Sequence, residues 1–281
     1  MRDELRISSG DITCSDLAVL TNLFAPDAGI ASLEGLQYAL NLEDVYLHGN
    51  EVTDVSPLAD LTKVWSLNFN LNEVTDVTPL ANLTAITELH LCCTTGNITD
   101  VSPLEGMVDM VGLNLSGHEL GDAVLWPLLE NYPFLLRLWI GENALTDFSA
   151  LANFPDLEVL QVSGNEIDDF TPIADLENLT ELQLHWATID DITPLYSMTQ
   201  LTFLNASGVG LSDTSFLEDF VSLEWLEITD NQITSLAPLV ANTGLGEGDY
   251  VDVRFNQLDL DDPGVQADIQ ALIDRGVELD Y

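Results

Sequence analysis

Three potential zinc ligands stand two residues apart along one short segment of the sequence: Glu88, His90 and Cys92. On an extended strand, side chains at i, i+2 and i+4 share one face. Carboxylate, imidazole and thiolate are all ligands that zinc accepts. Side chains at i and i+2 on a flat strand diverge, however, whereas a zinc ion needs ligands that converge on a tetrahedron. We therefore expect a solvated polar row here rather than a metal site.

A second set of carboxylates recurs at regular spacing and could suggest calcium. Neither the pair Asp168-Asp169 nor the pair Asp261-Asp262 lies in the oxygen-rich 12-residue loop of a calcium hand. Most members of the set stand just before a Ser/Thr-Pro pair, where the unsatisfied N–H groups of a helix start favour a carboxylate. We expect these residues to be structural caps: Asp54, Asp76, Asp100, Asp147, Asp169, Asp191 and Asp213.

Motifs of covalent and phosphoryl chemistry are missing from the sequence. No glycine-rich phosphate loop follows a predicted strand, no Gly-x-Ser-x-Gly occurs, and the four histidines form no triad with a nucleophile. The three cysteines are too few and odd in number for a disulfide framework. Cys14 is expected roughly 14 Å from the Cys92-Cys93 pair, too far for a bridge. Free thiols are the main expectation, and a vicinal Cys92-Cys93 disulfide stays open. These observations predict a protein that is not an enzyme and needs no cofactor.

The elements that position these residues follow from an internal repeat, which indicates a stacked architecture. The repeat length is 22 residues, extended to 24 and 25 by insertions after Leu91 and Leu120. Each unit reads apolar-x-x-apolar-x-apolar-x-x-Asn-x-apolar, and the central apolar-x-apolar predicts a short strand. The first apolar position is occupied by Leu20, Leu42, Val64, Ile86, Met110, Leu135, Leu157, Leu179, Leu201 and Leu223.

Two further positions of the unit predict local structure. A buried asparagine can satisfy backbone groups of its own coil and of the adjacent one, and the Asn position lapses to another residue in several coils. Ser/Thr-Pro pairs such as Ser56-Pro57 resemble an N-cap with proline at the first helical position, followed by room for one short helical turn. The Asn position holds Asn50, Asn72, Asn143, Asn165, Asn231 and Asn256.

These repeats resemble the leucine-rich repeat family, specifically its short 22-residue, bacterial internalin-like class. The resemblance covers nearly the whole chain. It implies an α/β leucine-rich-repeat solenoid of about ten repeats plus caps. A curved parallel β-sheet would form the concave face, and short helical or 3-10 turns would form the convex face.

The expected domain organisation has three parts: residues 1–19 as a partial N-terminal cap, 20–244 as leucine-rich repeats, and 245–281 as the last coil and a C-terminal cap helix. A cap is needed because an uncovered solenoid end would expose core. Asp262-Pro263 can begin the cap helix. Its apolar side would carry Val265, Ile269, Leu272 and Ile273. Residues 1–7 resemble the tail of a longer cap helix, so we expect either a natural chain that extends upstream or a naturally short cap.

Candidate binding residues come from the concave rows that this architecture implies. Five acids lie in these rows (Asp44, Glu88, Glu181, Glu227 and Asp252) and Asp27 stands at a strand end, so most of the 48 acids belong to other faces. Aromatic residues and arginine are the types that dominate binding hot spots. Some of these aromatic residues could instead pack against the caps. The predicted partner-binding residues are Tyr46, His90, Arg137, Trp139, Phe203, Trp225, Tyr250 and Arg254.

Charge narrows the class of partner. The chain has 6 Lys and Arg against 48 Asp and Glu, a formal net charge of −42. Such a surface repels phosphate backbones and anionic lipid, which excludes nucleic acid and electrostatic membrane docking. No run of 18 apolar residues predicts membrane insertion. The single lysine, Lys63, suits a protein that stays soluble in high salt.

The predicted function is a non-catalytic protein-interaction or adhesion module that binds a protein or glycan through its concave face. One alternative is a structural subunit that self-assembles into a surface layer or filament, and another is the recognition arm of a larger protein. The resemblance suggests an extracellular or cell-surface location, although no signal peptide is recognised in this sequence.

Overall fold

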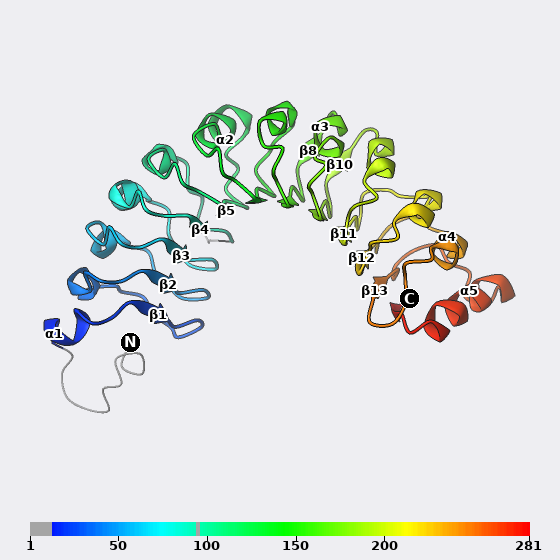
Figure 1. Cartoon of the computed structure of the whole chain (residues 1–281), viewed down its shortest axis with the longest axis horizontal. Coiled ribbons are helices and arrows are strands. Elements are labelled where there is room, and N and C mark those ends of the chain that lie inside the picture. The colour runs from blue at the N-terminus through cyan, green and yellow to red at the C-terminus, as the bar shows by residue number, and fades with distance from the viewer. Residues whose placement is uncertain (1–12, 94–95) are drawn as a thin grey trace. The chain divides into compact units, whose positions relative to one another are not determined.

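The computed structural model describes residues 13–93 and 96–281, without the side chain of Cys14. The chain divides into two compact units, Met1–Ala144 and Leu145–Tyr281. Each unit is a stack of similar coils. Within each unit, the strands gather on one side of the stack and the short helical turns on the other (Figure 1). This is the predicted leucine-rich-repeat architecture, with a parallel sheet and few, short helices.

The described residues of the first unit form six parallel strands in chain order. Neighbouring strands pair residue by residue, as in Asp44↔Ser66 and Ser66↔Glu88. Its elements are α1 (Cys14–Leu17), β1 (Asn22–Phe24), β2 (Asp44–Tyr46), β3 (Ser66–Asn68), β4 (Glu88–His90), β5 (Gly112–Asn114), α2 (Asp122–Leu129) and β6 (Arg137–Trp139). Between the strands lie the 3-10 turns η1 (Leu36–Tyr38), η2 (Ser56–Leu58), η3 (Thr78–Asn82) and η4 (Ser102–Leu104).

The second unit repeats the arrangement, and a two-stranded sheet is added on its loops. Its main strands are β7 (Val159–Gln161), β9 (Glu181–Gln183), β11 (Phe203–Asn205), β12 (Trp225–Glu227), β13 (Tyr250–Asp252) and β14 (Glu278–Asp280). The small sheet pairs β8 (Glu166–Ile167) with β10 (Thr188–Ile189). The helical elements are η5 (Ser149–Asn153), α3 (Thr171–Ala174), η6 (Thr193–Ser197), η7 (Ser215–Asp219), α4 (Ala237–Ala241) and α5 (Pro263–Asp274).

The core is one repeated set of apolar positions. In the coil of β2, Leu42, Val45 and Leu47 are fully buried, and so is Val52 in the loop that follows. Each coil is too small to enclose these side chains alone, so they are buried only by stacking on neighbouring coils. The three-residue strands are therefore stable as members of a sheet and not by themselves.

The asparagine prediction is confirmed by the hydrogen bonds. Asn72 accepts from the backbone N–H of Val52 (3.0 Å) and donates to the carbonyls of Leu47 (2.8 Å) and Phe69 (3.1 Å), so it joins two coils. His118 occupies the same position in a coil without asparagine. It is buried, its Nδ1 accepts from the N–H of Ile98 (3.2 Å), and its Nε2 lies 2.7 Å from the Leu91 carbonyl oxygen. The imidazole therefore replaces the amide in the same hydrogen-bonding role.

The aspartate prediction is also confirmed, with one correction. Asp54 accepts from the backbone N–H of Ser56 (2.8 Å), and the other six carboxylates of the set cap the residue two positions on in the same way. Hydrogen bonding with the Ser56 side chain, and next with its backbone N–H, holds the pKa of Asp54 below its usual value. The expectation that Ser56 is itself the N-cap was wrong, because the helical turn begins at Ser56 and no side chain of its N-cap residue Val55 can bond.

One backbone position of each coil is left-handed. It is the residue directly before the asparagine position, and it is glycine in some coils and a larger residue in others. Trp186 (φ 59°) lies against Gly208 of the next coil, where a Cβ would overlap the indole ring. Glycine there gives room for the tryptophan and also adopts the positive φ without strain. The non-glycine members are Asp27, Leu71, Cys93, Glu142, Trp186, Asp230 and Phe255.

The predicted C-terminal helix forms as α5. Asp262 caps it by accepting from the N–H groups of Gly264 (2.6 Å) and Val265 (3.2 Å). Val265, Ile269 and Leu272 are buried, but Ile273 is 43% exposed, so its assignment to the apolar side was wrong. The following strand, β14, was not predicted and pairs with β13. Of the expected partial N-terminal cap, residues 1–19, residues 1–12 lie outside the described residues, and the rest contains the short helix α1.

Candidate functional site

The outer face of the strands, which we call the strand face, carries the candidate site residues. Each strand of the main sheet has three residues, and the middle one is buried in every strand but β14, as in Val45 between Asp44 and Tyr46. Side chains alternate along a strand, so the first and third residues point away from the core. The structure gathers most of the predicted residues into two clusters, one in each unit.

The cluster of the first unit is built around an ion pair between Glu88 and Arg137. These residues lie on β4 and β6, and they pair across the intervening strand β5. The residue of β5 in register with both is Gly112, where a Cβ would overlap the Glu88 carboxylate. Because glycine has no side chain, it leaves the space in which the side chains of Glu88 and Arg137 meet. The side chain of Arg137, a predicted partner-binding residue, is therefore oriented by an ion pair within the protein.

His90 and Trp139 form the second layer of this cluster. Their ring centroids lie 5.5 Å apart, and Nε2 of His90 is 4.0 Å from the Glu88 carboxylate. Burial, and next the positive charge of Arg137, lower the pKa of His90 below its usual value. The ring is therefore neutral at pH 7, and the cluster has Trp139 and the imidazole as its partly exposed surface.

The zinc candidates do not assemble into a site. Cys92 is only 8% exposed, and burial raises the pKa of its thiol far above the ordinary range. Glu88 is committed to Arg137. No group of three or more potential ligands converges within residues 13–93 and 96–281. Cys92 and Cys93 are both free thiols. The predicted separation of Cys14 from them concerns a side chain outside the described residues.

Tyr46 lies apart from this cluster, nearer the start of the first unit. Its ring stacks on Phe24 of β1 at 4.9 Å and on His48 at 6.1 Å. Phe24 is exposed, so this small aromatic stack also faces solvent.

The cluster of the second unit is a row of three aromatic rings, which we call the aromatic row. Phe203, Trp225 and Tyr250 are in register on β11, β12 and β13. The Phe203 and Trp225 centroids are 6.1 Å apart with planes within 9°, and those of Trp225 and Tyr250 are 4.3 Å apart. Trp225 remains 40% exposed. Three rings at these distances form a continuous apolar strip on the strand face.

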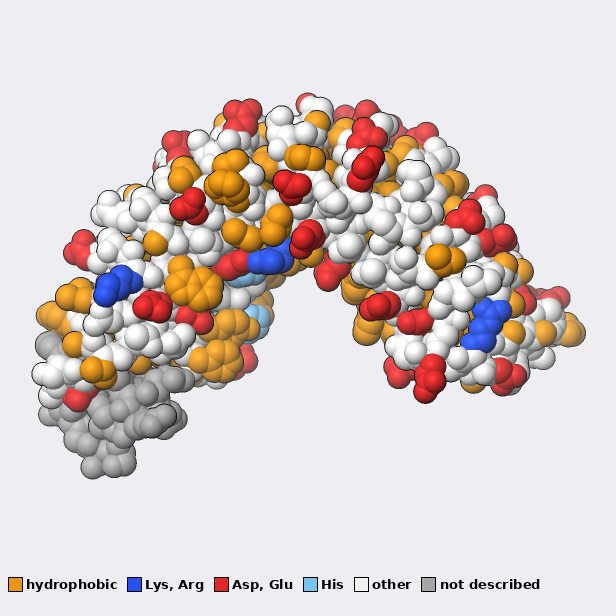
Figure 2. Space-filling view, viewed as in Figure 1, with side chains coloured by type: hydrophobic (Ala, Val, Ile, Leu, Met, Phe, Trp, Pro, Cys, Tyr) orange, Lys and Arg blue, Asp and Glu red, His pale blue; other side chains and the backbone are white. Residues whose placement is uncertain are grey.

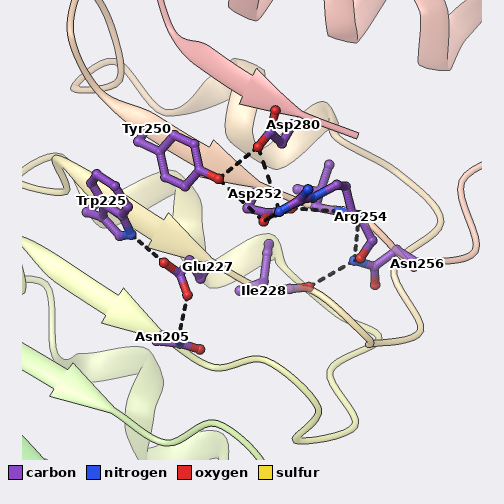
Figure 3. A network of polar contacts seen from close by, with 10 residues as sticks. Asn205, Trp225, Glu227, Ile228, Tyr250, Asp252, Arg254, Asn256 and Asp280 are labelled. Carbon is purple, nitrogen blue, oxygen red and sulfur yellow. Dashed lines mark hydrogen bonds and ion pairs between the residues drawn. The ribbon is translucent and has the colours of Figure 1, made fainter. Parts of the chain in front are cut away.

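Polar contacts fix the orientation of the aromatic row (Figure 3). The indole N–H of Trp225 donates to Glu227 (2.7 Å), whose other oxygen accepts from Asn205 (2.6 Å). The Tyr250 hydroxyl donates to Asp280 (2.9 Å), and burial and this acidic neighbour raise its pKa to about 12. Trp225 and Tyr250 are thus oriented by hydrogen bonds before any partner arrives, and Phe203 stacks on Trp225.

Arg254, predicted as a contact residue, belongs to the supporting network. Its guanidinium makes a two-pronged ion pair with Asp252, from Nε to Oδ1 (3.0 Å) and from Nη2 to Oδ2 (2.6 Å), and lies 3.8 Å from Asp280. Asp252 is buried, so Arg254 mainly neutralises a carboxylate that the protein has removed from water.

Sequence reasoning missed the carboxylates that hold the aromatic row. Glu227 stood in a predicted concave row. Its place two residues after Trp225 could have indicated the contact, since both side chains lie on the same side of a strand. Asp280 had no such signal, because β14 follows a helix and departs from the repeat.

On the surface seen in Figure 2, acidic side chains are spread over both units and Lys or Arg are few.

Within the described residues, every helix is too short or too polar to cross a lipid bilayer.

No protein-family model matches the chain, and no curated protein matches its sequence. Solved structures are similar. An internalin (InlF) of Listeria monocytogenes is 27% identical with a TM-score of 0.68, and the match covers 100% of this chain and 88% of the internalin.

Two more distant structures share the fold. The functional domain of internalin InlJ of Listeria monocytogenes is 23% identical over 88% of this chain and 51% of its own, with a TM-score of 0.63. A TLR13–ssRNA complex contains a chain that is 16% identical over 96% of this chain and 42% of its own, with a TM-score of 0.62. Both of these matches are below 25% identity and show only that the fold is shared.

Proposed function

Because the chain is an internalin-like leucine-rich repeat protein, we propose that it is a non-catalytic interaction module that binds a protein partner through the strand face of its repeats. The observation that carries the proposal is the aromatic row of Phe203, Trp225 and Tyr250. It is partly exposed, its rings contact one another, and hydrogen bonds hold Trp225 and Tyr250. Large aromatic side chains at the centre of a surface are the groups that dominate binding energy.

The mechanism is presentation of a rigid surface. Each coil is fixed to its neighbours by the strand pairing and by the asparagine hydrogen bonds, such as those of Asn231 to Ala206 (2.8 Å) and Leu211 (2.9 Å). A partner therefore meets side chains that are already ordered, and less conformational entropy is lost on binding. The Glu88–Arg137 pair of the first unit serves the same purpose by fixing the side chains around Trp139.

The similarity to internalins supports an extracellular or cell-surface location, where a rigid binding face would meet partners from outside the cell. The assembly-subunit alternative stays a prediction. Light scattering of the purified protein checks it, since large regular particles without any ligand are expected of such a subunit.

Affinity capture from extracts of cells or surfaces in the native environment tests the proposed face. We expect the wild-type protein to retain a partner and Trp225→Ala to lose it, with unchanged circular dichroism. Trp186→Ala is the matched control, because Trp186 is the more exposed indole (59%) but lies on a loop of the same unit. Equal capture by Trp225→Ala and the wild type, or no capture by either, contradicts the proposal.

A further inference from the structure

We infer that the aromatic row binds a basic segment of a protein partner, in which apolar residues stand between two positively charged ones. This inference rests on the proposed function and adds the chemistry of the ligand. It comes from the residues at both ends of the row, which are carboxylates of different strands.

The strand register places five side chains in one line across the second unit. Phe203 pairs with Glu181 on β9, and Tyr250 pairs with Glu278 on β14. Glu181 and Glu278 each occupy the first position of their strand, as the three aromatic residues do. The line therefore reads carboxylate, three aromatic rings, carboxylate.

The stacking closes the inner ring faces to a ligand. A group inserted between two rings needs about 7 Å, twice the usual van der Waals contact of about 3.5 Å, whereas the centroids are 6.1 Å and 4.3 Å apart. A ligand can touch the ring edges along the strip and the outer faces at its two ends. The strand register places Glu181 next to Phe203 at one end and Glu278 next to Tyr250 at the other. An aromatic face beside a carboxylate is a favourable site for an ammonium or guanidinium group.

The end carboxylates are not neutralised by the protein. Among the described residues, neither Glu181 nor Glu278 forms an ion pair, whereas Arg254 is already engaged with Asp252. Glu227, beside the middle ring, accepts from the neutral donors of Trp225 and Asn205 and forms no ion pair within the described residues. The strip is thus apolar along its middle and negative at its ends and on one side. The net charge of −42 also attracts basic partners at long range.

The distance between the end carboxylates sets the spacing in the ligand. Four strand spacings separate Glu181 from Glu278, which is about 19 Å. An extended chain rises about 3.4 Å per residue, so two basic residues about six positions apart span it. Six is an even number, so both side chains lie on the same side of the extended segment, as simultaneous contact requires.

Selection from a randomised peptide display library tests the inference. Peptides are selected on the immobilised wild-type protein and counter-selected on Trp225→Ala. We expect enriched sequences with two Lys or Arg about six positions apart and apolar residues between them. Enrichment of acidic or uncharged sequences, or no enrichment, overturns the inference. So does binding of oligosaccharides, tested in parallel, that depends on Trp225.

An enriched peptide then serves as the probe in fluorescence anisotropy. Glu181→Gln and Glu278→Gln are each expected to weaken binding about 2- to 5-fold, and the double variant about tenfold with a smaller dependence on salt. Glu218→Gln, an exposed acid of η7, is the matched control and should bind as the wild type does. Unchanged affinity of the double variant overturns the inference.

The two proposals fail differently. If a captured natural partner depends on Trp225 but is insensitive to the double variant, the basic-segment inference fails and the proposed function stands. If no natural partner is captured in a Trp225-dependent way, the proposed function fails as well.

Discussion

The guanidinium of Arg137 donates to the carboxylate of Glu88 across a strand that lies between them. The two residues are 49 positions apart in the sequence, and the residue in register between them is Gly112. A side chain at that position would occupy the space that the Glu88 carboxylate takes. The first unit therefore contains a polar contact that depends on the absence of a side chain in a third coil.

Gly112→Ala is expected to break this contact and to lower the free energy of unfolding by about 1 kcal/mol, the scale of a partly exposed ion pair. Chemical denaturation measures the change. Gly106→Ala is the control, because a Cβ there makes only ordinary contacts with Thr84 and Ala81. The explanation is wrong if Gly112→Ala destabilises the Glu88→Gln protein, which lacks the charged partner, as much as the wild type.

His118 makes the stability of the protein depend on pH. Burial lowers its pKa in the folded state below the ordinary value of 6.5. At a pH between the lowered folded-state pKa and the ordinary pKa of the unfolded chain, the unfolded chain binds more protons than the folded one. Stability therefore decreases as the pH falls below about 6.5. Protonation would also remove the acceptor that bonds the N–H of Ile98. Thermal melting between pH 5 and 8 should show this decrease.

His118→Asn is the informative variant, because asparagine fills the same position in other coils. It should fold and show a weaker dependence on pH in this window. His90→Gln measures how much of the pH dependence of stability comes from His90, whose pKa is also lowered. A His118→Asn protein with the full wild-type dependence would contradict this assignment.

Asn72→Ala is expected to cost about 2–4 kcal/mol of unfolding free energy. The substitution leaves the buried N–H of Val52 and the carbonyls of Leu47 and Phe69 without their side-chain partner, and each unsatisfied buried group is costly. Urea denaturation gives the value. Asn153→Ala, in the exposed end of η5, should change it by less than about 0.5 kcal/mol. Similar losses in both variants would show that position 72 has no special role.

Salt should stabilise the protein. The charge of −42 produces repulsion that screening relieves, so the melting temperature is expected to rise up to about 1 M NaCl, where the screening length is about 3 Å. In a variant with exposed acids of the helical side changed to amides, the melting temperature should rise less with added salt. A salt response that is absent, or equal in the two proteins, contradicts this explanation. The acids to change are Asp60, Glu105, Asp109, Asp156 and Glu177.

The repeat made the coil predictable. The positions of Leu42, Val45 and Leu47 in the pattern predicted a strand with a buried centre, and Asn50 predicted the turn that follows, as the structure confirms. These features depend on residues close in sequence and on the coil that precedes or follows, so the 22-residue period specifies them. The rows that face outward followed from the alternation of side chains along a strand.

The period carries less information about which outward-facing side chains contact each other. Arg137 and Arg254 were predicted as contacts for a partner, yet each is paired with a carboxylate of the protein. Cys92, expected on the exposed row, is buried. These outcomes depend on the length of each side chain and on what stands in register beside it.

The sequence by itself determined the architecture, because the apolar spacing recurs in every coil. It also determined which aromatic residues stand on the strand face, because side chains alternate along each short strand. The tertiary structure decided which residues support one another: Glu88 reaches Arg137 over Gly112, His118 replaces an asparagine, and Glu278 comes into line with Tyr250 through a strand outside the repeat. Such contacts join side chains of different coils. They depend on which residues stand in register on neighbouring strands, and only the folded chain establishes that register.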